Sequence, residues 1–279
     1  MENKNFDKKR IDEGSMKMFG FLFFIIVIFS TAYGVENLQV VPVVQSAAPE
    51  MAGMDVVFPQ HKGCVDNPVE IQLRMRGFLL GEKTSTPRAN ELVNDRLGQY
   101  VNVIIDDNIV FTSRGPSIYP LHDDGDYYQE FYKFSVPFDI KEGRHTMRVF
   151  MVKSYGECLK TKDGFVAVEF CLKNKKIDCG LNLTKPYVSY NQPSHNIKHK
   201  NSGPILLDFY ISNCQLSSDG YKVQLYVDNK KIMRLEKWCP YYLYGLSTGK
   251  HTIKLVLLDK KDKEIPDKEG CAEGSFLVF

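Results

Sequence analysis

The sequence of 279 residues predicts an all-β protein built from two tandem β-sandwich domains that follow an N-terminal signal segment. Two observations predict the sandwiches: short segments with apolar residues at every second position, and an internal repeat of those segments. Such alternation is typical of strands with one face on a core. Six or more short strands in a unit of about 100 to 130 residues, separated by Gly, Pro, Asn and Asp turns, indicate two packed sheets.

The repeat is visible in three pairs of matched segments. The pairs are 68–75 with 204–211, 98–106 with 220–228, and 143–149 with 249–255. The third pair is the closest match, since each copy begins with Gly, a basic residue, His and Thr. Repetition at this scale predicts that each copy is one structural unit.

The N-terminus resembles a secretory signal. Lys8, Lys9 and Arg10 precede an apolar run at 18–29, and small residues follow at Ala32 and Gly34. This order predicts a signal peptide over residues 1–34, cleaved after Gly34. An uncleaved anchor is the alternative, and it would be the protein's sole connection to a membrane. Either reading makes the remainder a secreted, periplasmic or cell-surface protein.

The rest of the chain divides into three parts. Residues 35–50 are predicted to be an extended linker, 51–177 a first domain and 178–279 a second domain. The first domain carries insertions at 82–97 and 112–130 that the second lacks. A function specific to this protein is therefore expected in the first domain.

The charge of the chain gives no argument for nucleic acid or an anionic membrane surface as a partner. Lys and Arg number 36 against 34 Asp and Glu, which gives a net charge of +2. This balance supplies no positive field for nucleic acid. We expect no nucleic-acid partner and no cofactor, and the oligomeric state stays open.

The second domain resembles a known family. Segments 227–229, 240–242, 245–253 and 257–259 are similar to bacterial immunoglobulin-like modules, which occur in adhesins and beside carbohydrate-active enzymes. The resemblance covers about 186–279, and more loosely 54–172. It implies an immunoglobulin-like sandwich, but it leaves the function open because such modules act as binders in some proteins and spacers in others.

The sequence gives little support for catalytic or metal-binding residues. His145 and His251 recur in both repeats, but no nucleophile or paired carboxylate recurs beside them, so we expect a structural role at the turn and no enzyme activity. Segment 123–126, with Glu130, lacks the spacing of a calcium loop. His195 and His199 have metal-like spacing, but Pro193 argues for a loop there, and no metal site is expected.

Aromatic residues are the candidate ligand contacts. Tyr119, Tyr127, Tyr128 and Phe131 fall in or beside the second insertion, where strand alternation does not demand burial. Exposed rings there could stack on sugars or anchor a protein interface. The alternative is that they fold back over the sandwich as a satellite core. For Trp238 and Tyr241–Tyr244 in the second domain, core packing is favoured.

Seven cysteines, none in a C-x-x-C pair, are potential disulfide partners in an exported protein. Cys214, Cys239 and Cys271 are expected at one end of the second sandwich, where one pair among them would form a disulfide. The sequence leaves the pair open.

These observations favour a non-enzymatic exported or surface protein whose immunoglobulin-like domains bind a protein or a glycan. The first alternative is a structural spacer in a cell-envelope assembly. A divergent secreted hydrolase is the second.

Overall fold

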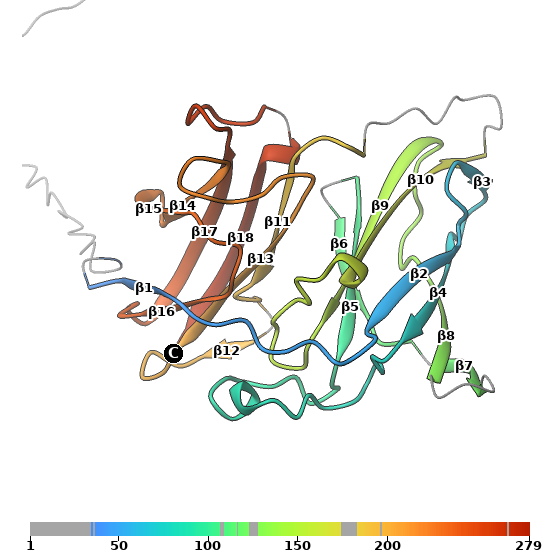
Figure 1. The fold of residues 1–279 in the computed structure, drawn as a ribbon, viewed down its shortest axis with the longest axis horizontal. Helices are drawn as coiled ribbons and strands as arrows, with labels where there is room; N and C mark the ends of the chain where they lie inside the picture. The colour runs from blue at the N-terminus through green and yellow to red at the C-terminus, as the bar shows by residue number, and fades with distance from the viewer. Residues whose placement is uncertain are drawn as a thin grey trace, which may run out of the picture. The chain divides into compact units, whose positions relative to one another are not determined.

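A computed structural model describes residues 35, 37–106, 109–115, 117–122, 128–173, 183–195, 197–266 and 268–279 (Figure 1). Strands dominate, and the helical elements of this part of the chain are the 3-10 turns η1 (Pro87–Asn90), η2 (Lys162–Gly164) and η3 (Lys268–Gly270). The predicted all-β class is confirmed. Within these described ranges, no helix has the length and apolar character needed to cross a membrane.

The first sandwich consists of two sheets around one core. One sheet has the order β2 (Gly53–Phe58), β4 (Glu70–Arg76), β8 (Tyr128–Ser135), β7 (Ser117–His122). The other has the order β3 (Gly63–Val65), β10 (Phe165–Leu172), β9 (Gly143–Val152), β5 (Tyr100–Ile105), β6 (Ile109–Ser113). Ile71 and Leu73 of β4 share a fully buried cluster with Val103, Met147 and Phe170 of the opposite sheet. The apolar residues that alternate along these strands therefore form one core shared by the two sheets.

The second sandwich repeats this arrangement. Its first sheet has the order β11 (Tyr187–Gln192), β13 (Ile205–Ser212), β16 (Tyr241–Tyr244), β1 (Gln39–Pro42). Its second sheet has the order β12 (Lys198–His199), β18 (Cys271–Val278), β17 (Gly249–Leu258), β14 (Lys222–Val227), β15 (Lys230–Leu235). Leu207 and Phe209 of β13 meet Leu225, Leu255 and Phe276 of the facing sheet in the core.

The segments matched in the sequence occupy equivalent places in the two sandwiches. Strand β4 corresponds to β13, β5 to β14 and β9 to β17, and in each sandwich a short strand pairs in parallel with the last one. The boundary predicted between 177 and 178 lies outside the described residues.

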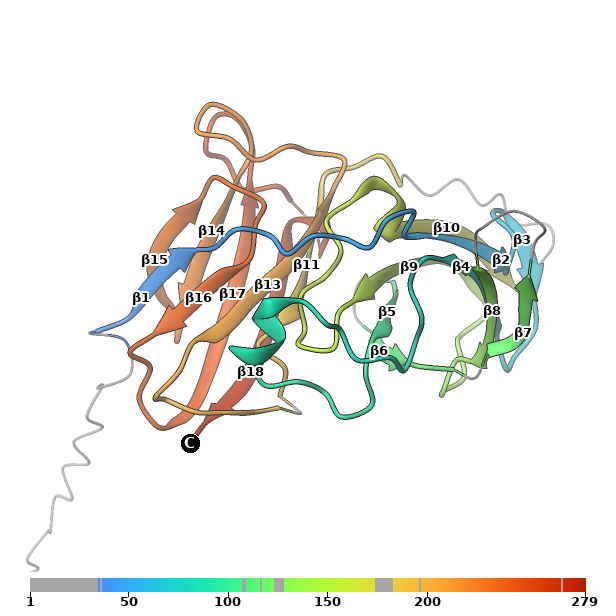
Figure 2. The same cartoon turned by 60° about the horizontal axis from the view of Figure 1, so that its bottom comes forward.

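Strand β1 is an exception, because it lies in a sandwich that is remote from it in the sequence. The sequence predicts a linker over 35–50, and within it Gln39–Pro42 pairs antiparallel with Tyr241–Tyr244 of β16 (Figures 1 and 2). The segment that precedes the first sandwich in the chain thus supplies an edge strand to the second. Residues 33–279 form one compact unit.

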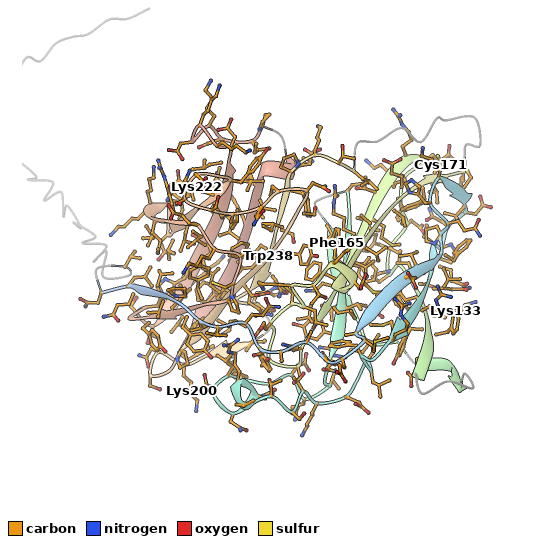
Figure 3. All side chains as sticks on the ribbon, in the orientation of Figure 1. Lys133, Phe165, Cys171, Lys200, Lys222 and Trp238 are labelled. Carbon is orange, nitrogen blue, oxygen red and sulfur yellow. The ribbon has the colours of Figure 1, made fainter. Side chains whose placement is uncertain are left out.

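The outer faces of two sheets are also buried, because the sandwiches pack on each other there. All six residues of β5 are buried, as are seven of the eight in β13. The ring of Tyr210 on β13 stacks on Phe165 at 4.6 Å and on Phe150 at 5.6 Å between ring centroids. Trp238, marked with Phe165 in Figure 3, lies edge-on to Tyr210 and donates from Nε1 to the Phe209 carbonyl oxygen across 3.1 Å. Aromatic packing of this kind stabilises the contact beyond the area it buries.

Candidate binding groove

A groove of about 1050 Å³ lies beside this contact. Strands β5 and β6 of the first sandwich form one wall, and β11 and β18 of the second form the other. Four aromatic side chains line it, namely Tyr100, Phe111, Tyr187 and Tyr190. The groove therefore joins aromatic surfaces from both sandwiches.

A chain of side-chain amides fixes the floor of the groove. Asn102 on β5 donates to Oδ1 of Asn191 on β11 across 2.9 Å, and Asn102 Oδ1 accepts from the Thr112 hydroxyl at 2.8 Å. Asn191 Nδ2 in turn donates to Asp208 Oδ2 at 2.6 Å and to the Gly156 carbonyl oxygen at 2.7 Å. Both asparagines are buried, and the hydrogen bond between them joins the two sandwiches. The floor is thus formed before any ligand arrives.

The tyrosine rings are held by neighbouring cations. The guanidinium of Arg114 lies 4.8 Å from the centroid of Tyr100, and that of Arg148 lies 4.0 Å from the centroid of Tyr187. Burial raises the pKa of Tyr100, so its hydroxyl stays protonated, and it accepts a 3.3 Å hydrogen bond from Gln192 Nε2. These contacts fix the orientation of the rings.

Tyr190 lies against a glycine that its ring requires. A Cβ placed on Gly274 of β18 would come within 1.9 Å of Tyr190 Cε1. The hydroxyl of Tyr190 is held by the carbonyl oxygen of Pro193. Gly274 therefore sets how close β18 comes to β11 at this wall of the groove.

Ser189 is the groove residue with unused hydrogen-bonding capacity. Ser189 is 4% exposed, and its Oγ has no hydrogen-bond partner within the described structure. A buried hydroxyl without a partner costs free energy, and a ligand that hydrogen-bonds to it removes that cost.

The aromatic residues predicted to bind a ligand lie elsewhere. Tyr119, Tyr128 and Phe131 lie in the β7 and β8 hairpin, where Tyr119 is opposite Phe131, and Tyr127 is outside the described residues. These three residues therefore lie in paired strands, Tyr119 in β7 and the other two in β8. Phe131 is half-buried opposite Arg74 of β4 and does not line the groove.

The residues that do line the groove carry a weak sequence signal. In β5, the positions that face away from the first core are Tyr100, Asn102 and Ile104, which are aromatic, amide or aliphatic. The corresponding positions of β14 begin with Lys222 and Gln224, which are buried as well, so this signal alone does not separate the two strands. Uncharged side chains on both faces of a strand indicate burial on both faces.

His145 and His251 each bridge an aspartate and a backbone carbonyl. His145 Nδ1 lies 2.6 Å from Asp106 Oδ2, and Nε2 lies 2.7 Å from the Lys141 carbonyl oxygen. In the second sandwich, His251 makes the same contacts with Asp228 at 2.7 Å and Ser247 at 2.8 Å. The expected backbone contact at the turn is present, and the aspartate partner is a contact that sequence reasoning missed.

The charge state of His145 follows from this geometry. Burial lowers its pKa, but the hydrogen bond and charge of Asp106 and the carbonyl of Lys141 outweigh burial, so the pKa of His145 is raised. Both nitrogens face acceptors, which favours the doubly protonated ring. This arrangement holds a turn together and offers no free nitrogen for catalysis.

The expected disulfide among Cys214, Cys239 and Cys271 is wrong, because all three are free thiols. In the β13 and β16 register, Leu207 lies opposite Tyr241, so Cys239 falls level with residue 209 while Cys214 lies five residues farther along, roughly 16 Å. A disulfide needs Cα atoms within about 7 Å. Cys271 lies in the other sheet, and Cys171 is the described cysteine that is disulfide-bonded.

The described part of the chain shows no arrangement of side chains suited to bind a metal ion. Those residues contain no group of three or more His, Cys, Asp or Glu side chains placed to hold an ion. His199 is buried, and its Nε2 lies 3.2 Å from the Ser194 carbonyl oxygen. Segment 123–126 lies outside the described residues.

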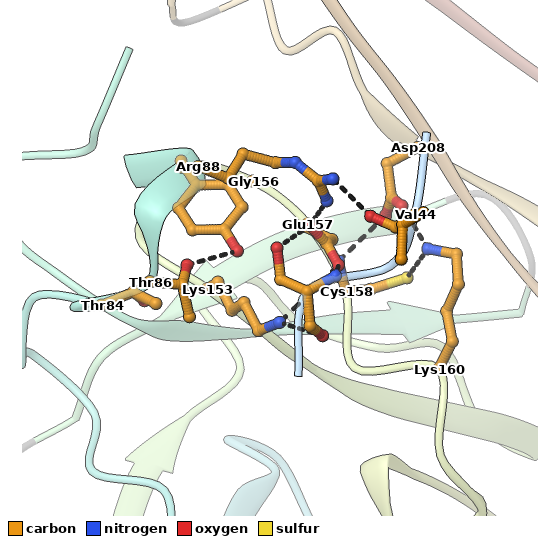
Figure 4. A network of polar contacts seen from close by, with 12 residues as sticks. Val44, Thr84, Thr86, Arg88, Lys153, Gly156, Glu157, Cys158, Lys160 and Asp208 are labelled. Carbon is orange, nitrogen blue, oxygen red and sulfur yellow. Dashed lines mark hydrogen bonds and ion pairs between the residues drawn. The ribbon is translucent and has the colours of Figure 1, made fainter. Parts of the chain in front are cut away.

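A buried ionic network borders the groove floor (Figure 4). The carboxylate of Asp208 binds the Lys160 ammonium and also accepts from the Cys158 backbone N–H at 3.0 Å. Lys160 Nζ also lies 3.1 Å from Cys158 Sγ. Burial raises the pKa of the Cys158 thiol well above its usual value, so the reactive thiolate is disfavoured. The cluster is suited to joining strands and not to nucleophilic chemistry.

Comparisons with known proteins give structural likeness alone. No family model and no curated protein matches the sequence. Fibronectin(III)-like modules of CbhA from Clostridium thermocellum are similar at 15% identity and a TM-score of 0.25, covering 81% of this chain and 93% of that one. A chimeric titin Z1Z2 tandem is similar at 11% identity and a TM-score of 0.22, covering 81% and 98%.

A third similar structure is SGBP-B of a Bacteroides ovatus mixed-linkage glucan utilization locus, in complex with a mixed-linkage heptasaccharide. The identity is 9%, the TM-score is 0.22, and the match covers 77% of this chain and 43% of that one. At such scores the likeness carries no argument about this chain, whose fold class rests on its own sheets.

Proposed function

We propose that this chain is a non-enzymatic, exported binding protein that holds a glycan in the groove between its two sandwiches. The observation that carries the proposal is the buried, unpartnered Ser189 hydroxyl in a groove whose half-buried aromatic side chains are Phe111 and Tyr190. Sugar rings stack on aromatic faces, and their hydroxyl groups donate to and accept from such a side chain.

A glycan fits this groove better than an apolar protein segment does. Its described walls alternate rings with amide and hydroxyl side chains, whereas an apolar segment is bound by deep aliphatic pockets. The groove is also fixed by the Asn102 to Asn191 bond, which reduces the entropy lost on binding.

A test uses residues 35–279 on an array of neutral β- and α-glucans, mannans and chitin oligosaccharides. Thr112 is exposed at the rim, so Thr112→Trp fills the groove and is expected to abolish binding. The matched control is Thr252→Trp, an exposed threonine of β17 outside the groove, which is expected to bind normally. Ser189→Ala is expected to weaken binding about fivefold, the loss of one hydrogen bond of roughly 1 kcal/mol.

An array without a bound glycan would overturn the proposal. So would binding that survives Thr112→Trp. A structural spacer would then be the better reading, and one observation favours it: buried bonds such as Asn102 to Asn191 hold the sandwiches together and would stiffen an elongated assembly.

A further inference from the structure

The edge of β16 is completed by a strand from a remote part of the chain. In the first sandwich, the equivalent strand β8 is covered by β7, which lies directly before it in the sequence. In the second sandwich, only residues 236–240 separate β15 from β16, too few to form a further strand. Strand β1 therefore takes the position next to β16 that β7 takes next to β8.

The two strands in this position share a protective feature. Strand β1 ends in Pro42, and β7 contains Pro120. Proline lacks the backbone N–H that a further strand would need, so it blunts a sheet edge. Without β1, the edge that β16 would present, Tyr241–Tyr244, contains no proline.

Side chains on one face of the segment pack into the second core. Leu38 and Val40 are partly buried against the cluster that contains Leu243. Val41, on the opposite face of β1, is 40% exposed to solvent. At the far end of β16, Gly245 has a φ of +81°, and a Cβ there would come within 2.3 Å of the Asn37 carbonyl oxygen. The edge of β16 is thus shaped around a bound strand.

A second anchor holds the same segment to the first sandwich (Figure 4). The Glu157 carboxylate accepts from the Ser46 backbone N–H at 2.8 Å and from its hydroxyl at 3.0 Å. Lys153 Nζ donates to the Ser46 carbonyl oxygen at 2.8 Å, and Arg88 binds both Glu157 and the Val44 carbonyl oxygen. Most of these bonds go to backbone atoms of the segment.

The connection from this segment to the first sandwich is an exposed turn. Pro49, Glu50 and Met51 are exposed, Met51 has a φ of +61°, and Ala52 N–H donates to the Pro49 carbonyl oxygen at 3.2 Å. Exposed turns of this kind tolerate cleavage and act as hinges in strand exchange.

We propose that the edge of β16, together with Glu157, is a peptide-binding site for an extended aliphatic strand. Residues 35–48 of a second copy of this chain can occupy the site in place of the first chain's own residues 35–48. The site binds by strand addition: backbone bonds supply affinity, and the inward positions 38 and 40 supply selectivity.

The test inserts a protease site into the turn at 49–52 of residues 35–279. The cut protein is unfolded and refolded with a fluorescent peptide of residues 35–48, and uptake is followed by anisotropy and by the melting temperature. The labelled peptide is expected to be taken up and to restore the melting temperature of the uncut protein.

Two matched peptides identify the face that is read. Val40→Asp places a charge against the core and is expected to weaken uptake tenfold or more, by about 1.4 kcal/mol at least. Val41→Asp places the same charge in solvent and is expected to bind within about twofold of the original. Equal uptake of both peptides overturns the proposal, as does failure of the original peptide to bind or to restore the fold.

Discussion

The side-chain amide of Asn102 donates a 2.9 Å hydrogen bond to Oδ1 of Asn191, which ties β5 of the first sandwich to β11 of the second. Asn191 also donates to Asp208 and to the Gly156 carbonyl oxygen, so one side chain serves three partners.

Replacing Asn191 should therefore destabilise the whole unit. Asn191→Leu removes the partner of the Asn102 amide and of the Gly156 carbonyl oxygen and one of the donors to Asp208, and we expect a loss of about 2 to 4 kcal/mol in the free energy of unfolding, measured by urea denaturation. The control Asn201→Leu changes an exposed asparagine and should shift it by less than about 0.5 kcal/mol. Similar losses of stability for the two variants would mean that the hydrogen bonds of Asn191 do not stabilise the unit.

The His145 and Asp106 pair should make stability depend on pH. The folded pKa of His145 is raised above the value of about 6.5 for an unfolded chain. Its contribution is therefore fully present below pH ~6.5 and is lost as the pH rises through the raised folded pKa. Urea denaturation of the protein should give a lower free energy of unfolding at pH 9 than at pH 6.

Asp106→Asn tests the cause of that decline. The amide keeps the shape but removes the charge that favours the imidazolium, so the difference between pH 6 and pH 9 should shrink. Asp139→Asn changes an exposed carboxylate and should leave the difference as it is. An unchanged difference in Asp106→Asn would assign the pH dependence to another group.

The Lys160 and Asp208 pair should be costly to break on one side. Both side chains are at most 1% exposed, so Asp208→Ala leaves a buried, unpaired ammonium and should cost about 3 to 5 kcal/mol in urea denaturation. Adding Lys160→Met removes that charge and should recover part of the loss. The exposed control Asp66→Ala should be nearly neutral. A double variant no more stable than Asp208→Ala would argue against an unpaired charge as the cause.

Gly274 should resist even a methyl group. Gly274→Ala brings Cβ into the Tyr190 ring, and the shift needed should cost about 1 to 3 kcal/mol in thermal or urea unfolding and change the near-ultraviolet circular dichroism of the groove tyrosines. Gly203→Ala is the matched control, because a Cβ there meets nothing within 4 Å. Equal stability of the two alanine variants would show that Tyr190 moves aside freely.

The strands of both cores were predictable because burial on one face imprints period 2 on the sequence. Ile71 and Leu73 of β4 and Leu207 and Phe209 of β13 are buried where the alternation or the repeat places them. The backbone pairing of β1 with β16 leaves no such imprint. Val40 and Val41 are chemically alike, and nothing in their order predicts which strand at the other end of the chain will pair with them.

The groove was harder still to predict. Its floor depends on Asn102 and Asn191, whose bond requires both sandwiches to be in place, and single-strand patterns carry no information on such a contact. The predicted disulfide failed for a similar reason: sequence gives which strands exist but not how far each cysteine lies along its neighbour's register.

The position of β1 also bears on how the chain folds during synthesis. Its residues are made well before those of β16, so the second sandwich closes its edge by a contact between distant parts of the chain. Contacts of long sequence separation slow folding, because the loop between them must be closed first. A growing chain would carry the aliphatic segment 38–44 without its partner strand until β16 has been made, and this interval is when a chaperone would be most useful to it.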